Sequence, residues 1–314
     1  MRRRTVLITL SLLFIIAIPF VTKAHDDKGP GSVRVIRDLA YSKDDNDKDS
    51  KNLNQSQMLD LYIPTKPAAG SQPLIVFIHG GAWLQGDKSE AKDLAMLLAH
   101  AGFATASINY RLSQEAAYPA QIVDCKNAIR YLRAHAAEYG LDPNKIGVWG
   151  VSAGGHLAAL LGTMSSSDTP SFVPDSSAVQ AVCDWCGPTD LVSVARQAGS
   201  RTKIDYETPS GPVAKLLGGL ASDKKDLAVQ ASPITYVSKG DPPIMIVHGD
   251  IDDLVPFSQS EEFIEKLKAA GVPAKLITVK GAGHNLDSEQ EIKRLTDFFR
   301  QILIEGKRDF QVDG

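Results

Sequence analysis

From residue 73 onward, almost continuously apolar runs alternate with segments that repeat apolar residues at helical spacing. Such runs are typical of strands buried on both faces, and alternating strands and helices require crossovers that place the strands parallel. The predicted strands are 73–81, 103–110, 145–150, 178–185, 242–249 and 274–279, and the predicted helices are 89–102, 119–140, 153–164, 257–271 and 289–303. We therefore predict an α/β fold with a mostly parallel central sheet and helices on both faces.

Two segments depart from this alternation. Residues 32–42 and 58–64 each alternate apolar and polar side chains around a charged stretch, which predicts an N-terminal antiparallel hairpin. Residues 187–241 contain no clear strand and are rich in glycine, proline, serine and charge, which indicates an inserted cap or lid. The predicted organisation is a single domain over 25–314 that carries this cap.

The first 24 residues have the pattern of a secretory signal peptide. Three arginines precede an apolar run of 16 residues from Val6 to Val21, and small residues follow up to Ala24. A membrane-spanning helix usually needs about 20 apolar residues, so an uncleaved anchor is the weaker alternative. We expect cleavage after Ala24 and export to the periplasm or the extracellular space, with no stable membrane association afterwards.

Charge and cysteine content narrow the partners and the chemistry. The formal net charge of the 314 residues is −3, and a nucleic-acid partner would need a basic face, so none is expected. Export favours disulfides, and because the sequence has three cysteines, one thiol would remain unpaired. We expect a structural bridge between Cys125 and either Cys183 or Cys186. The spacing of the last two is that of a redox motif, but no helix of thioredoxin type follows them.

Ser152 stands in Gly-Val-Ser-Ala-Gly, between a predicted strand and a predicted helix. A sharp turn here tends to force a positive φ at the serine, and bulk two residues before or after it would collide, so Gly150 and Gly154 are required. The turn lifts the hydroxyl above the sheet and directs the first N–H groups of the helix to the same point. Ser152 is therefore a candidate nucleophile. The alternative is a small-residue turn that only allows close helix–strand packing.

A serine nucleophile needs a base, and the base needs an acid that orients it. Of the seven histidines, His284 lies in a glycine-bracketed loop after the last predicted strand, at the edge where open α/β sheets bind ligands. Helix capping would explain those glycines equally well. Asp250, Asp252 and Asp253 follow another buried strand, and each could belong to a merely solvated turn. The order serine, aspartate, histidine nevertheless fits a catalytic triad.

The His-Gly-Gly motif at 79–81 follows the strand predicted before it. Glycines allow the backbone to approach a ligand closely and to turn its N–H groups inward. Gly81 and Ala82 can then face Ala153, and their three backbone N–H groups form a candidate oxyanion hole. The alternative is a glycine turn without a role in catalysis. It would then be a coincidence that this turn occurs on the loop where the fold needs backbone donors.

Together these motifs resemble the α/β-hydrolase family, and within it the hormone-sensitive-lipase-like carboxylesterases, especially the branch of acetyl-xylan and feruloyl esterases. The matching segments run in the family's order over roughly residues 59–284 and are LDLYIP, HGGAW, INYRL, the block from YPAQIVDC to HLAALLG, CGPTDL, ASPITYV, PPIMIVHGDIDDLVP and GAGH. The resemblance implies an α/β-hydrolase fold with a Ser-His-Asp triad.

The resemblance also selects individual residues. The family's acid lies in His-Gly-x-x-Asp-x-x-Val-Pro, which implies Asp252 rather than its neighbours. Ala82 replaces a glycine common in the group; it still offers its N–H, and its methyl group narrows the acyl site. Trp83 is implied either to line the substrate pocket or to pack. Asp124 and Asp190 match family positions and are expected to cap or buttress helices.

The sequence thus predicts a secreted serine carboxylesterase that forms an acyl-enzyme on short-chain or aryl esters. Acetyl or feruloyl groups on xylan-type polysaccharide are the substrates that the resemblance implies. No metal or organic cofactor is expected, since there is no zinc-ligand pattern and GVSAGG fails the dinucleotide spacing. The alternatives are a small amide or peptide hydrolase of arylformamidase or peptidase type, and a non-catalytic binding module on the same scaffold.

Overall fold

The computed structural model describes residues 32–42, 55–65, 70–164, 176–199, 202–286 and 288–312. The signal peptide predicted over 1–24 lies outside these residues. Among the helices of the described part, none combines the length and the apolar character that a membrane crossing requires.

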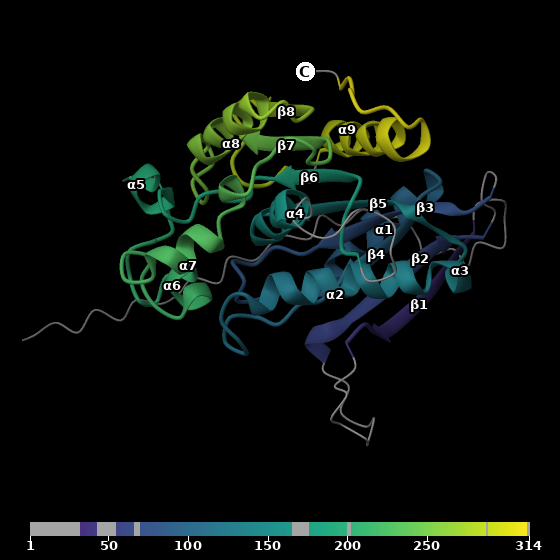
Figure 1. The fold of residues 1–314 in the computed structure, drawn as a ribbon, viewed down its shortest axis with the longest axis horizontal. Helices are drawn as coiled ribbons and strands as arrows, with labels where there is room; N and C mark the ends of the chain where they lie inside the picture. The colour runs from purple at the N-terminus through teal and green to yellow at the C-terminus, as the bar shows by residue number, and fades with distance from the viewer. Residues whose placement is uncertain are drawn as a thin grey trace, which may run out of the picture.

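The described residues form one mixed sheet of eight strands (Figure 1). In pairing order these are β1 (Val33–Ala40), β2 (Met58–Pro64), β4 (Ala104–Ile108), β3 (Gln72–Ile78), β5 (Leu141–Val151), β6 (Ala181–Trp185), β7 (Ile244–Gly249) and β8 (Ala274–Val279). β2 pairs antiparallel with β1 and β4, and all other pairs are parallel. The predicted mostly parallel sheet and the antiparallel pairing at its N-terminal edge are confirmed.

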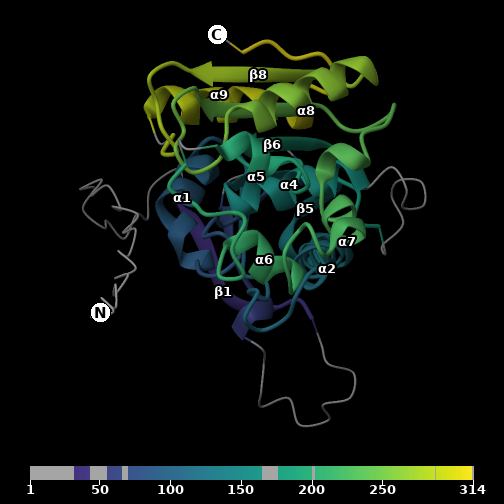
Figure 2. The same ribbon diagram turned by 90° about the vertical axis from the view of Figure 1, so that its left-hand side faces the viewer.

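Helices cover both faces of this sheet (Figure 2). One face packs on α2 (Ala120–Ala134), α4 (Ala153–Met164) and α8 (Ser258–Ala269), and the other on α1 (Lys92–His100) and α9 (Glu289–Phe299). Short elements complete the fold: α3 (Ala136–Tyr139), 3₁₀ turns at Gln55–Gln57, Lys88–Ala91 and Pro233–Thr235, and a π-helical turn at Arg300–Ile304. The strand side chains alternate between the two cores, as a period of two requires.

The central helix α4 follows directly from its small, apolar sequence. Every residue from Ala153 to Thr163 is buried. Its glycines let it lie close to the sheet: a Cβ added at Gly162 would stand 2.6 Å from Cγ2 of Val182 on β6. Close packing of this kind fixes the helix axis against the strands, and with it the position of the helix N-terminus.

The segment between β6 and β7 has no strand in its described part, as predicted for the insertion over 187–241. It contains α5 (Val194–Ala198), α6 (Pro212–Leu217) and α7 (Lys225–Gln230), which lie at one end of the sheet in Figure 1. The Tyr206 hydroxyl donates to the Leu254 carbonyl at 2.7 Å, so this segment rests on the loop that follows β7. A role as a cap or lid stays a prediction.

The predicted disulfide is wrong, because all three cysteines are free thiols. Cys125, on α2, belongs to the core on one face of the sheet, whereas Cys183 and Cys186 belong to the core on the other face. The sheet therefore separates the expected partners. Cys186 instead directs its sulfur toward His284, as described next.

Candidate active site

Ser152 occupies the tight turn between β5 and α4. Its φ is +58°, its N–H donates to the Trp185 carbonyl at 2.7 Å, and its carbonyl accepts from the His156 N–H at 3.0 Å. A Cβ added at Gly150 would stand 2.1 Å from the Gly154 carbonyl oxygen, and one added at Gly154 would stand 2.0 Å from that of Ile78. The two glycines are therefore sterically required, for the reason that the sequence indicated.

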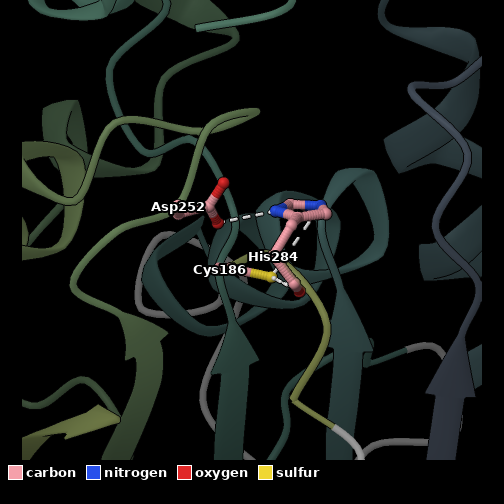
Figure 3. A group of neighbouring side chains, drawn as sticks. All are labelled: Cys186, Asp252 and His284. Carbon is pink, nitrogen blue, oxygen red and sulfur yellow. Dashed lines mark hydrogen bonds and ion pairs between the residues drawn. The ribbon is translucent and has the colours of Figure 1, made fainter. Parts of the chain in front are cut away.

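His284 and Asp252 meet at the carboxyl edge of the sheet (Figure 3). Nδ1 of His284 and Oδ2 of Asp252 are 2.6 Å apart, and Oδ1 of Asp252 accepts from the N–H groups of Leu254 and Val255 at 2.8 and 2.9 Å. Asp252 is 8% exposed and is held in one orientation by these bonds. This geometry is that of an acid that orients an imidazole.

The other two candidate acids are occupied elsewhere. Asp250 accepts from the Gly281 N–H at 2.7 Å, and Asp253 forms an ion pair with Lys203. Both bonds hold loops rather than a histidine. Of the three neighbouring aspartates, the structure therefore brings only Asp252 to His284.

His248 forms a further contact that sequence reasoning did not assign. Its Nε2 lies 3.1 Å from Oδ2 of Asp252, and its Nδ1 lies 2.6 Å from the Ser260 hydroxyl. The chain Ser260–His248–Asp252–His284 is buried apart from the last ring. The position of His248, four residues before the acid and at the end of a buried strand, is the sequence signal that could have suggested it.

These contacts set the protonation of the pair. Burial alone would raise the pKa of Asp252, but hydrogen bonds from His248 and His284 hold it well below its usual range. Burial would lower the pKa of His284, whereas Cys186 and Asp252 raise it, and the net direction is upward. Burial raises the pKa of Cys186 and leaves it a neutral thiol, so the Asp252 carboxylate is the group whose charge raises the pKa of His284. A proton held on Nδ1 leaves the Nε2 lone pair of neutral His284 free.

The 79–82 loop lies beside the serine. A Cβ added at Gly80 would stand 2.9 Å from the Val151 carbonyl and 3.5 Å from Cβ of Ser152, so only glycine allows this approach. Gly81 and Ala82 have φ values of +99° and +56°. Within the described residues, neither of their N–H groups has a hydrogen-bond partner. Strained backbone with unpaired donors is typical of an oxyanion site.

Ala153, the third candidate donor, opens α4, where first-turn N–H groups have no partner within the helix. Trp83 is 2% exposed, and its indole N–H donates to Nδ1 of His156 at 3.2 Å. That contact packs the ring inside the protein, and a role for Trp83 in substrate binding stays a prediction.

Three further acidic residues form hydrogen bonds that hold parts of the fold together. Asp124 accepts from Nε and one terminal nitrogen of Arg111, both at 2.8 Å, and Asp190 accepts from the Val192 N–H at 2.9 Å. Asp184 on β6 is fully buried and accepts from the Gly187 N–H at 2.9 Å, and burial raises its pKa to about 7. A Cβ at Gly155 would stand 2.3 Å from this carboxyl group, so Asp184 lies directly against the start of α4.

Strand β6 links Ser152 to the edge of the sheet where His284 lies. The backbone N–H of Ser152 donates to the carbonyl of Trp185, the last residue of β6, and the sulfur of the next residue, Cys186, lies 3.9 Å from Nε2 of His284. No hydrogen bond joins the Ser152 hydroxyl to His284 among the contacts of the described residues. In enzymes without substrate this bond is often long and tightens on binding.

The geometry is that of an α/β-hydrolase, and the chain belongs to the BD-FAE family, whose model matches residues 59–267. It is 32% identical over 242 residues to esterase LipC of Mycobacterium tuberculosis, a match that covers 74% of this chain and 57% of LipC. The chain spans little more than half the length of the curated mycobacterial esterases that it matches.

Solved structures of esterases are also similar to this chain in sequence and in fold. A truncated carbohydrate esterase from gut microbiota has a TM-score of 0.73 and 34% identity, over 88% of this chain and 98% of that one. An acetyl ester-xyloside bifunctional hydrolase from Caldicellulosiruptor lactoaceticus has a TM-score of 0.64 and 25% identity, over 86% and 93% of the two chains. The resemblance to the α/β-hydrolase esterases is therefore confirmed.

The packing of the turn yields a first prediction. Gly154→Ala forces a Cβ to within 2.0 Å of the Ile78 carbonyl, so β3 and α4 must separate. We expect a loss of about 3 kcal/mol or more in the free energy of unfolding, measured by urea denaturation. Gly271→Ala is the control: its φ of +74° is strained but its surroundings are open, so about 1 kcal/mol is expected. Equal losses in both variants would contradict the packing argument.

Proposed function

We propose that the protein is a carboxylic-ester hydrolase in which Ser152 is the nucleophile, His284 the general base and Asp252 the acid that orients the base. The contact that carries the proposal is the 2.6 Å bond between the buried Asp252 carboxylate and Nδ1 of His284. It holds the proton on Nδ1 and leaves Nε2 as the proton acceptor. The esterase names of the relatives support the same reaction class.

In the proposed mechanism, His284 Nε2 takes the proton of Ser152 as the hydroxyl attacks the ester carbonyl. The N–H groups of Gly81, Ala82 and Ala153 bind the developing oxyanion, and each such donor typically lowers the barrier by about 3–4 kcal/mol. The protonated imidazole then donates its proton to the leaving alcohol. A water molecule, deprotonated by His284, releases the acid from Ser152 and restores the free serine.

The proposed substrates are short-chain or aryl esters, including acetyl and feruloyl groups on xylan-type polysaccharide. Ala82 stands at a position where the family often has glycine, and the proposed effect of its methyl group is to narrow the acyl site and so to favour small acyl groups. The carbohydrate esterase and the acetyl ester-xyloside hydrolase described above support a sugar ester. The predicted signal peptide over residues 1–24 adds the proposal that the protein acts outside the cytoplasm.

Two alternatives remain distinguishable in the same assays. An amide hydrolase would cleave anilides at rates comparable with the corresponding esters. A binding module on this scaffold would neither turn over esters nor react with a fluorophosphonate. The bond between the buried Asp252 carboxylate and the partly exposed His284 ring favours catalysis, because a module without chemistry has no need for an oriented imidazole.

Replacement of the proposed nucleophile gives the most direct test. Ser152→Ala is expected to lower kcat for p-nitrophenyl acetate about 10⁴- to 10⁶-fold with little change in thermal stability. Fluorophosphonate labelling should disappear in the same variant. Ser89→Ala removes the hydroxyl of an exposed serine outside the proposed triad and is the matched control. It should retain both ester hydrolysis and fluorophosphonate labelling. Full activity in Ser152→Ala would refute the proposal.

The pH profile tests the acid. His284 must be neutral to accept a proton, so kcat/KM falls as pH drops through its pKa, which Asp252 raises. Asp252→Asn removes the negative charge, so the acidic limb should move to lower pH while the plateau falls about 10³- to 10⁴-fold. In Asp250→Asn, whose carboxyl group binds Gly281, the limb should stay in place. An unmoved limb in Asp252→Asn would assign the titration to another group.

Acyl preference tests the substrate proposal. We expect p-nitrophenyl acetate and butyrate to be cleaved at least about tenfold faster than laurate, and acetic acid to be released from acetylated xylan. Ala82→Gly removes the methyl group, so the kcat/KM ratio of butyrate to acetate should rise severalfold. A preference for laurate in the wild type, or an unchanged ratio in Ala82→Gly, would contradict the narrow acyl site.

A further inference from the structure

His156 joins three segments around the site, and the proposed mechanism does not use it. It lies in the first turn of α4, is fully buried, and its backbone N–H donates to the Ser152 carbonyl at 3.0 Å. Nδ1 of its ring accepts from the indole N–H of Trp83 at 3.2 Å, and its Nε2 lies 2.6 Å from the Ala231 carbonyl. One side chain thus links the nucleophile turn, the residue that follows the 79–82 loop, and the insertion between β6 and β7.

The two ring contacts define the protonation state of His156. An indole N–H can only donate a hydrogen bond, and a backbone carbonyl can only accept one. Nδ1 is therefore unprotonated, and Nε2 carries the proton that it donates to Ala231. Burial lowers the pKa of His156 to about 4, so the ring stays neutral at neutral pH. With both nitrogens paired, the ring is held from two sides.

Trp83 ends a strained stretch of backbone that contains two of the candidate oxyanion donors. Gly81, Ala82 and Trp83 have φ values of +99°, +56° and +58°. Before this stretch, Gly80 packs too closely on the end of β5 to carry any side chain. After it, the indole of Trp83 is bound by His156. Strained backbone persists only where its surroundings hold it, so these two anchors fix the direction of the N–H groups between them.

The part of the insertion that binds His156 is itself well anchored. Ala231 is fully buried, and the neighbouring Gln230 carbonyl accepts from the Tyr118 hydroxyl at 2.7 Å. At the start of the insertion, a Cβ added at Gly187 would stand 2.4 Å from the backbone nitrogen of His156. The insertion therefore packs on His156 at two separate points and leaves its ring no room to turn away from the indole.

We propose that His156 is a positioning residue for ester hydrolysis: through the indole of Trp83, it holds the N–H groups of Gly81 and Ala82 in the direction that binds the oxyanion. Its effect falls on kcat rather than on KM, because such donors bind the charged oxygen of the transition state more strongly than the carbonyl of the bound ester. The effect on turnover rests on the proposed function, whereas the bond between Trp83 and His156 does not.

Substitutions that keep one ring contact and lose the other test this role. His156→Asn places an amide oxygen near the former Nδ1 and keeps an acceptor for Trp83, whereas His156→Gln places an amide nitrogen near the former Nε2 and keeps only a donor for Ala231. His156→Leu keeps neither. We expect kcat for p-nitrophenyl acetate, measured well below the melting temperature of each variant, to fall about 10- to 100-fold in His156→Leu and His156→Gln, with KM changed less than about threefold. His156→Asn should recover to within about threefold of the wild-type kcat.

Two further variants separate this bond from general damage to the core. Trp83→Phe removes the indole N–H and should lower kcat as His156→Leu does. The double variant should be no slower than the slower single one, because both changes remove the same bond. His135→Leu is the matched control. It removes an imidazole whose Nδ1 lies 2.9 Å from the Tyr131 carbonyl at the end of α2, and it should keep the wild-type kcat.

The indole resonance of Trp83 reports the bond without reference to activity. In protein labelled with ¹⁵N-tryptophan, the indole cross-peak that is missing in Trp83→Phe belongs to Trp83. A bond to imidazole shifts its proton downfield, so the peak should move upfield in His156→Leu and stay in place in Ser152→Ala. Ser152→Ala should meanwhile lose activity, and an active Ser152→Ala would count against the proposed function alone. An unmoved peak or an unchanged kcat in His156→Leu, or a lower kcat in His156→Asn than in His156→Gln, would overturn the positioning role.

Discussion

The close approach of three backbone segments beneath Ser152 determines most of the site. Gly150 pairs with Ile78 across β5 and β3, and Gly154 packs on the Ile78 carbonyl from the first turn of α4. No side chain fits between these segments. Because protein interiors tolerate little overlap or void, this contact fixes the turn, the helix N-terminus and the 79–82 loop as one unit. The strained φ at Ser152 persists because its surroundings leave no alternative.

A second constraint is the buried charge of Asp252. An ionised carboxylate inside a protein is costly unless its oxygens are bonded, and here each oxygen has two partners. Two are backbone N–H groups of its own loop, and two are imidazoles from β7 and from the loop after β8. The acid therefore ties together chain segments that are far apart in sequence. The orientation of His284 is a consequence of satisfying this charge.

Much of the fold could be predicted because the strands are buried on both faces and are nearly uninterrupted in sequence. The strand from Ile244 and the helix from Ala153 begin within two residues of the predicted positions. The serine turn was also predictable, since its glycines leave a steric signature in a short stretch. By contrast, the expected bridge from Cys125 failed because sequence does not show on which face of a sheet a cysteine lies.

The sequence by itself determined the elements, their order and the chemical types at the edge of the sheet: a serine in a tight glycine turn, a histidine after the last strand and acids after the strand before it. Local sterics and hydrophobic periodicity carry that information. The family motif already implied Asp252, but only the tertiary structure joined its carboxylate to Nδ1 of His284, brought His248 behind it and set Cys186 beside His284. These contacts depend on where side chains from different strands and loops point. Neighbouring residues of a turn point in different directions, so the backbone of the turn decides which of them meets a given partner.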